Sequence, residues 1–141
     1  CIRDRKEDGT YLTLTKAEAE PTEEKPAPTS GIVLFVASDI IGRGEDRSLG
    51  ILIMHSFLNT VGALTIKPET IVFMNNGVKL VTKDSPVLGE LRQLESQGIE
   101  LLACGTCLSR FQLTDKVAVG QVSNMYTLAD TLIRAKKVVA L

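Results

Sequence analysis

Two cysteines, Cys104 and Cys107, are separated by only two residues, and their spacing suits sulfur chemistry. They follow residues 99–103, a short apolar run that predicts a buried strand, and a helix can begin at Leu108. Cys104 would then lie where a strand ends and a helix begins, and backbone N–H groups there favour a thiolate. The pattern therefore indicates redox or sulfur-transfer chemistry.

Three other interpretations of this pair remain open. Cysteine is often buried, so both thiols could be inert parts of a core. A structural zinc site needs four ligands, and the chain offers only Cys1 and His55 as further cysteine or histidine ligands. A structural disulfide is the third, although three cysteines in 141 residues are not the framework of a small secreted domain. We expect no metal and no cofactor.

Hydrolytic cysteine chemistry needs a base to take the thiol proton. The only histidine, His55, lies among apolar residues of a predicted helix, which indicates a buried or interfacial side chain. Two reactions need no dedicated base, namely disulfide exchange and the carriage of sulfur as a persulfide.

Strand and helix signals alternate over residues 31–141, which predicts an α/β domain with a mostly parallel five-stranded sheet. The predicted strands are residues 32–37, 70–74, 99–103, 117–119 and 138–141. The predicted helices are residues 48–64, a helix capped by Ser85 and ended by Gly98, one from Leu108, and one capped by Ser123 or Asn124.

Small and polar residues follow the predicted strands. Right-handed connections between parallel strands would gather them at one edge of the sheet. The candidate binding residues are Ser38, Asp39, Gly42, Asn75, Gly77, Ser123 and Asn124. The alternative is that loops and caps simply require these residue types. A dinucleotide loop is not indicated, since Arg47 stands where its third glycine would fall.

The first thirty residues differ in character from the rest. Residues 1–16 carry an Asp8-Gly9 hairpin signal, and residues 17–30 contain three of the five prolines, which predicts an exposed linker and the first site of proteolytic cleavage. The chain does not begin with Met, so we expect it to be a fragment. Its first residues form no signal peptide, and a cytoplasmic location is expected.

The charge balance is ordinary for a soluble domain. Sixteen basic residues face 17 acidic ones, and only 4% of residues are aromatic, so nucleic acid is not an expected partner.

Residues 48–66 contain no charged residue and have apolar side chains all round the predicted helix. We expect one stripe to face the sheet: Leu49, Leu52, Ile53 and Phe57. We expect a second group to face another subunit: Ile51, Met54 and Leu58. A charge placed at Met54 or Leu58 would then break a homo-oligomer. Polar residues and glycines within the stretch argue against a membrane span.

Four segments together resemble the DsrE-like domain of the YedF family, sulfurtransferase-like proteins linked to selenium metabolism. They are Ser-Asp-X-X-Gly-Arg-Gly at 38–44, Asn-X-Gly-Val-Lys-Leu at 75–80, Ala-Cys-Gly-Thr-Cys at 103–107 and Val-Ser-Asn-Met-Tyr at 122–126. The resemblance covers residues 31–141. Residues 1–16 resemble the last hairpin of a TusA/SirA-like domain, but the Cys-Pro-X-Pro motif of that domain is absent.

The resemblance implies a flavodoxin-like three-layer fold, a trimer or hexamer, and Cys104 as the acceptor of persulfide sulfur. Our hypothesis is a cytoplasmic sulfur or selenium carrier in which Cys107 resolves the persulfide or passes it on. Its partners would be sulfur donor and acceptor proteins or small persulfides. The alternative is a non-catalytic oligomeric module that positions an upstream sulfur-carrier domain, so the sequence leaves open whether the protein is an enzyme. The carrier hypothesis requires that solvent reach Cys104.

Overall fold

The computed structural model describes residues 30–141. The predicted hairpin at residues 1–16 and all of the predicted linker except Ser30 lie outside this range. The strands of the described part are β2 (Ile32–Val36), β3 (Thr70–Phe73), β4 (Glu100–Cys104), β5 (Gln121–Ser123) and β6 (Lys137–Ala140). Its α-helices are α1 (Arg47–Val61), α2 (Leu88–Ser96), α3 (Gly105–Arg110) and α4 (Met125–Arg134), and its 3-10 helices are η2 (Asn75–Val81) and η3 (Thr114–Lys116).

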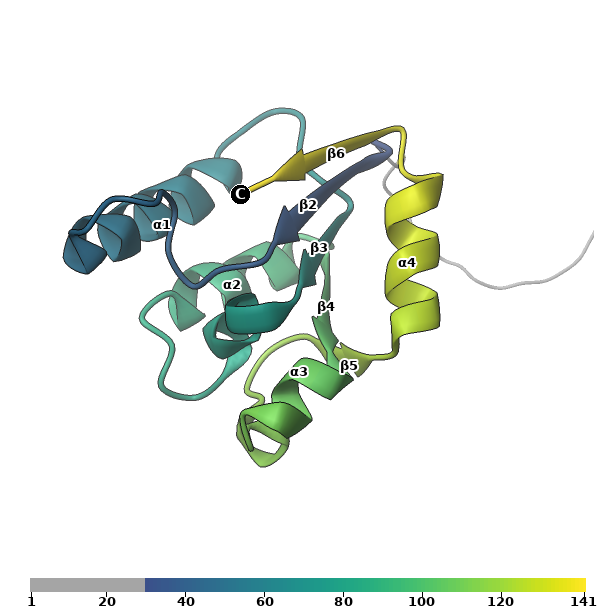
Figure 1. Cartoon of the computed structure of the whole chain (residues 1–141). Coiled ribbons are helices and arrows are strands. Elements are labelled where there is room, and N and C mark those ends of the chain that lie inside the picture. Colours follow the sequence, from purple (N-terminus) through teal and green to yellow (C-terminus); the bar gives the residue numbers. More distant parts are fainter. Residues whose placement is uncertain (1–29) are drawn as a thin grey trace, which may run out of the picture.

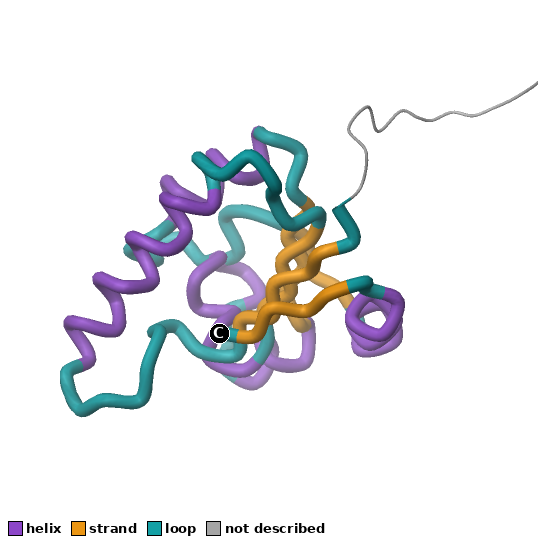
Figure 2. Tube along the Cα trace, turned by 90° about the horizontal axis from the view of Figure 1, so that it is seen from above, coloured by secondary structure: helices purple, strands orange, loops and turns teal. Residues whose placement is uncertain are grey.

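The five strands form one sheet in the order β5-β4-β3-β2-β6, and every neighbouring pair is parallel. Helices lie on both sides of this sheet, with α4 alone on one side (Figures 1 and 2). The prediction of a flavodoxin-like, three-layer α/β domain is confirmed. All five strands are parallel, so the carboxyl ends of the strands meet at one edge, where the polar loops were expected.

The connections after β4 and β5 leave the sheet toward opposite sides. The chain leaves β4 into α3, which packs against η2, and η2 in turn contacts α2. It leaves β5 into α4, which contacts β2 and β4 (Figure 1). In open parallel sheets, the point where neighbouring connections diverge is where a binding crevice forms. The carboxyl ends of β4 and β5 are such a point.

The core is built on β3, whose four residues are all buried. Parallel strands with helices on both faces of the sheet have both of their faces buried. This explains the continuous apolar runs in this sequence. The predicted fourth strand at residues 117–119 is wrong. Val117 forms only an isolated antiparallel bridge with Thr82, and the strand that pairs with β4 is Gln121–Ser123.

Helix α1 presents the opposite face from the one predicted. Met54 and Leu58 are almost fully buried in the core, whereas Leu49 is 51% and Leu52 60% exposed. A charge at Met54 or Leu58 would therefore disrupt the core and would not test assembly. Among residues 30–141, no helix has both the length and the apolar character that crossing a membrane would require.

The start of one helix agrees with the prediction, and the starts of two others differ from it. Asn124 caps α4 as expected, since its side chain accepts a hydrogen bond from the backbone N–H of Thr127. Helix α2 begins later than predicted, at Leu88, and Ser85 Oγ accepts the N–H of Val87 in the preceding turn. Helix α3 begins earlier than predicted, directly after Cys104.

Candidate functional site

The two cysteines lie where β4 passes into α3. Cys104 is the last residue of β4 and the N-cap of α3, and its Sγ accepts a hydrogen bond from the N–H of Cys107 at 3.4 Å. Cys104 is only 2% exposed, whereas Cys107 is half-buried, and both are free thiols. The expectation that Cys104 is the solvent-reachable thiol is wrong. A strand end places its side chain in the sheet layer, and the following turn brings Cys107 to the outside.

The thiol of Cys107 is held by a backbone amide from another element. Its Sγ accepts a hydrogen bond from the N–H of Asn75 at 3.1 Å. Burial raises the pKa of the Cys107 thiol, and the adjacent Cys104 thiol raises it further, whereas the Asn75 N–H acts in the opposite direction. The Cys107 thiol is therefore mostly protonated at neutral pH. When it does ionise, the N–H of Asn75 is placed to stabilise the thiolate.

The position of the Asn75 amide is fixed by close packing of η2 on β2. Asn75 adopts a left-handed backbone conformation with φ of 51°. The N–H of Met74 donates to the carbonyl oxygen of Val36 at 3.0 Å. A Cβ at Gly77 would lie 2.1 Å from the same oxygen, so only glycine allows this approach. The donor that faces Cys107 is thus part of a rigid backbone contact.

The end of β5 completes this edge of the sheet. Cys104 pairs with Ser123 in the parallel register, and a Cβ at Gly105 would lie 3.1 Å from the Ser123 carbonyl oxygen. This is the divergence point of the connections after β4 and β5. The described structure therefore brings Asn75 and Ser123 to the cysteine pair through their backbones.

The remaining predicted residues have other surroundings. The side chain of Ser38 accepts the N–H of Ile40 at 3.2 Å, and that of Asn124 accepts the N–H of Thr127 at 2.9 Å, so both stabilise local backbone. Gly42 is exposed with φ of 101°. Asp39 forms an ion pair with Arg47 in a separate cleft.

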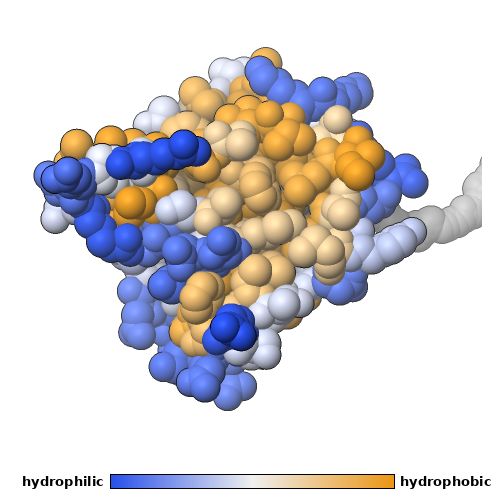
Figure 3. All heavy atoms as spheres, viewed as in Figure 1, coloured by the Kyte–Doolittle hydropathy of each residue, from blue (hydrophilic) through white to orange (hydrophobic). Residues whose placement is uncertain are grey.

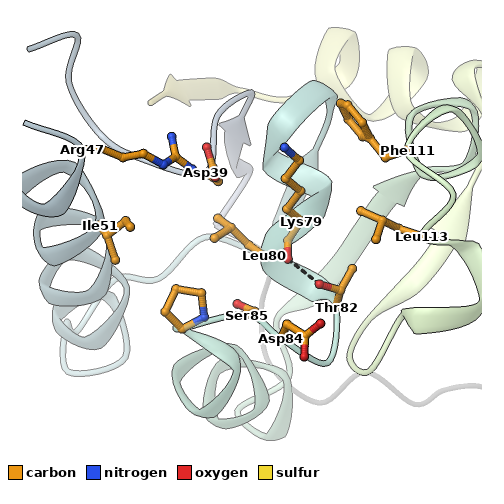
Figure 4. A pocket seen from close by; sticks show the side chains of 11 residues that line it. Asp39, Arg47, Ile51, Lys79, Leu80, Thr82, Asp84, Ser85, Phe111 and Leu113 are labelled. Atoms are coloured by element: carbon orange, nitrogen blue, oxygen red, sulfur yellow. Dashed lines mark hydrogen bonds and ion pairs between the residues drawn. The ribbon is translucent and has the colours of Figure 1, made fainter. Parts of the chain in front are cut away.

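That cleft is open to solvent and has a volume of about 470 Å³. Figure 4 shows that its walls come from α1, from η2 and the turn after it, and from the segment after α3. Its lining residues are Asp39, Arg47, Ile51, Lys79, Leu80, Thr82, Asp84, Ser85, Pro86, Phe111 and Leu113. Of these residues, only Asp39 was predicted from the sequence as a binding residue. Lys79 falls within the segment 75–80 that carries the family resemblance, which is the one signal that points to it.

His55 contributes to neither place. Its Nε2 lies 2.7 Å from Glu90 Oε2, which links α1 to α2, and its side chain is 50% exposed. Within residues 30–141, no three His, Cys, Asp or Glu side chains gather closely enough to hold a metal ion.

Comparison with known proteins identifies the fold. A family model described as the DsrE/DsrF-like family matches residues 39–141. No curated protein has significant similarity to the chain. Several solved structures are similar. MTH1491, a protein of unknown function from Methanobacterium thermoautotrophicum, has a TM-score of 0.56 and 18% identity, over 78% of this chain and 97% of its own.

Two further structures are similar to the same extent. The ychN protein from E. coli has a TM-score of 0.54 and 14% identity, over 77% of this chain and 97% of its own. BT1422, a conserved protein of unknown function from Bacteroides thetaiotaomicron, has a TM-score of 0.55 and 20% identity, over 79% of this chain and 95% of its own. At these identities the likeness supports the fold alone.

Proposed function

Because the chain belongs to the DsrE/DsrF-like family, we propose that it carries sulfane sulfur, or selenium, on its Cys-Gly-Thr-Cys segment. The observation that supports this most directly is the pair of free thiols at the divergence point of the sheet, one inner and one outer. A carrier needs one thiol that a donor can reach and a protected setting for the sulfur that it holds. The cysteine pair offers both.

The burial of the two thiols suggests that Cys107 is the acceptor, with Cys104 as the inner partner. The Cys107 thiolate attacks the outer sulfur of a persulfide R–S–SH, a bond forms between these two sulfurs, and the S–S bond of the donor breaks. The leaving group R–S⁻ then takes up the proton that the Cys107 thiol had lost and becomes R–SH. The product is Cys107–S–SH. A thiol acceptor then takes the outer sulfur by the reverse of this step.

Cys104 provides a second way out of the persulfide state. Its thiolate attacks the Cys107 sulfur, HS⁻ leaves, and a disulfide joins the two residues. A dithiol reductant is then required to restore both thiols. The Asn75 N–H, which donates to Cys107 Sγ, stabilises the Cys107 thiolate that remains after the outer sulfur passes to a thiol acceptor.

The competing proposal is a non-catalytic oligomeric module that positions an upstream sulfur-carrier domain. Two observations favour it, namely the near-complete burial of Cys104 and the exposed apolar side chains of α1. We further propose that the protein has a YedF-type role in selenium metabolism, is located in the cytoplasm and forms a homo-oligomer. Residues 1–16 are proposed to be part of a TusA/SirA-like domain.

Intact-protein mass spectrometry after incubation with a small persulfide donor tests the proposal. In a Cys1→Ser background, we expect the chain to gain one sulfur atom. Cys107→Ser should abolish the gain, and Cys104→Ser should retain it while preventing disulfide formation. A Cys104→Ser chain that gains no sulfur would reverse the two roles. If no variant gains sulfur and the background chain forms no Cys104–Cys107 disulfide, the module proposal is favoured.

A further inference from the structure

The open cleft between α1 and η2 has the character of a ligand site that is separate from the cysteines. Its volume of about 470 Å³ is within the usual range for small-molecule sites. Neither cysteine lines it. We propose that this cleft binds a small amphipathic carboxylate, with the anionic group at Lys79 and the apolar part against the walls. The proposal goes beyond sulfur transfer and does not depend on it.

The cleft is built into the fold. Its floor includes Leu80, which is 1% exposed, and Thr82, whose hydroxyl donates to the carbonyl oxygen of Lys79 at 2.8 Å. The backbone N–H of the next residue, Lys83, donates to the carbonyl oxygen of Lys116 at 2.9 Å. This hydrogen bond links the turn to the chain after α3. The cleft is therefore present before any ligand binds, and binding need not order its floor.

Lys79 is the cation that a ligand would meet. Its Nζ lies 4.8 Å from the centroid of the Phe111 ring, so the ring holds the ammonium group in the cleft. Among residues 30–141, no carboxylate lies within the ion-pair distance of 4.0 Å from this ammonium. An ammonium that is partly removed from water gains most from an anionic partner.

The other charged groups of the cleft are already paired or in water. Arg47 and Asp39 form an ion pair, and the Asp39 side chain is 14% exposed. Asp84 is exposed at the rim. Figure 4 shows Lys79 between the Asp39–Arg47 pair and Phe111. Among the described residues of the cleft, Lys79 is thus the cation without a carboxylate partner, and Asp84 opposes an anionic ligand.

The apolar walls select the rest of the ligand. Ile51 contributes from α1, and Phe111 and Leu113 contribute from the segment after α3. All three are partly buried, so a short hydrocarbon chain would remove their remaining surface from water. A carboxylate of about six carbons combines a short apolar chain for this surface with one anionic group.

Hexanoate, 1-hexanol and hexylammonium are matched probes, because they share chain length and differ in charge. NMR titration of the full chain should show amide shifts at the cleft, with hexanoate binding about tenfold more tightly than hexanol and hexylammonium more weakly than either. Lys79→Gln should remove the advantage of hexanoate, and Lys79→Arg should keep it. Lys83→Gln is the control, since Lys83 does not line the cleft.

Asp84→Asn gives a second readout that does not depend on the folding of a Lys79 variant. It should tighten hexanoate binding, because it removes a like charge from the rim. Equal binding of hexanoate and hexanol, stronger binding of hexylammonium, or no shift with any probe at millimolar concentration would overturn the proposal. A chain with both Cys104→Ser and Cys107→Ser should bind hexanoate normally, so the outcome is independent of the sulfur-carrier proposal.

Discussion

Cys107 has surroundings that both protect and restrain its thiol. Burial and the Cys104 thiol raise its pKa, whereas the backbone N–H groups of Asn75 and of Cys107 itself favour the charged form. The thiolate is the nucleophile in sulfur exchange, so a raised pKa lowers the reactive fraction at neutral pH. In the proposed carrier, the same partial burial would limit the access of water to a persulfide on Cys107. If the chain carries sulfur as proposed, a partner that brings a positive charge to this edge would lower the pKa of the Cys107 thiol and favour the transfer.

The pH dependence of Cys107 alkylation follows from the direction of this shift. With the pKa raised, the thiolate fraction should grow about tenfold per pH unit and still be rising near pH 9, where an ordinary thiol with a pKa of about 8.5 approaches its plateau. Iodoacetamide rates at the Cys107 peptide, followed by mass spectrometry between about pH 6 and 10, measure this. The urea-unfolded chain is the control, and a plateau of the folded chain below pH 8 would contradict the expectation.

At the scale of elements, the contact between η2 and β2 positions the amide that faces Cys107. Gly77 allows that contact because its Cα approaches the Val36 carbonyl more closely than any side chain permits. The start of η2 cannot move without moving Asn75. Stability of the fold and geometry of the site are therefore linked at this one glycine.

Gly77→Ala should destabilise the protein by about 3 kcal/mol, because a Cβ would lie 2.1 Å from the Val36 oxygen and the backbone must shift. Gly89→Ala is the matched control. Gly89 lies within α2 with no atom within 4 Å of an added Cβ, so alanine should stabilise the helix by up to about 1 kcal/mol. Urea unfolding monitored by circular dichroism gives both values. A Gly77→Ala protein as stable as the unmodified chain would show that η2 is not fixed in this way.

The strand and helix pattern predicted most elements, and the exceptions have physical causes. Residues 117–119 are apolar, and Val119 is buried, but the chain there bonds to Val81 outside the sheet. Strand β5 is an edge strand with two exposed residues, so it has no apolar signal and is defined by backbone pairing with β4. Burial and strand pairing are separate properties, and the sequence pattern reports only burial.

The orientation of helix α1 could not be predicted from its sequence either. Apolar residues occur all round it, so its sequence contains no preferred face, and the orientation is decided by packing. Gly50 lies against the side chain of Ile40, where an added Cβ would be 2.7 Å from the Ile40 Cβ. This contact with the loop after β2 helps to set the rotation that buries Met54.

The candidate site was also predicted only in part. Alternation of strands and helices correctly placed the cysteines at the end of a parallel strand. It could not predict which thiol is deeper, because the turn from β4 into α3 decides that. The hydrogen bond from Asn75 to Cys107 uses a backbone donor, which every residue except proline carries, so residue type gives no signal for it.

At the scale of the whole molecule, large apolar side chains remain exposed on two helices. Leu49, Leu52 and Ile53 lie on α1, and Tyr126 and Ile133 on α4. Figure 3 shows apolar surface spread over the middle of the face between these helices. Such surface is typical of an interaction site. It supports the proposal that copies of the chain associate, with a different face of α1 from the one first expected.

Leu52→Glu should reduce the assembled protein to a monomer with little loss of fold stability, since Leu52 is 60% exposed. Met54→Ala is the contrasting variant. Met54 is 1% exposed, so its truncation should cost about 2–5 kcal/mol of folding free energy. Light scattering gives the mass, and thermal unfolding gives the stability. A monomeric unmodified chain at micromolar concentration would contradict assembly.

Strand β6 pairs with β2, where Ile32 lies beside Lys137 in the parallel register. During synthesis, β2 is made about one hundred residues before β6, its second neighbour in the sheet. Pairings between segments so distant in the sequence form slowly. Over that interval one edge of an apolar strand is open to other nascent chains. A chain truncated before Lys137 would keep that edge permanently, so loss of β6 should lead to aggregation in the cell before it affects any chemistry at the cysteines.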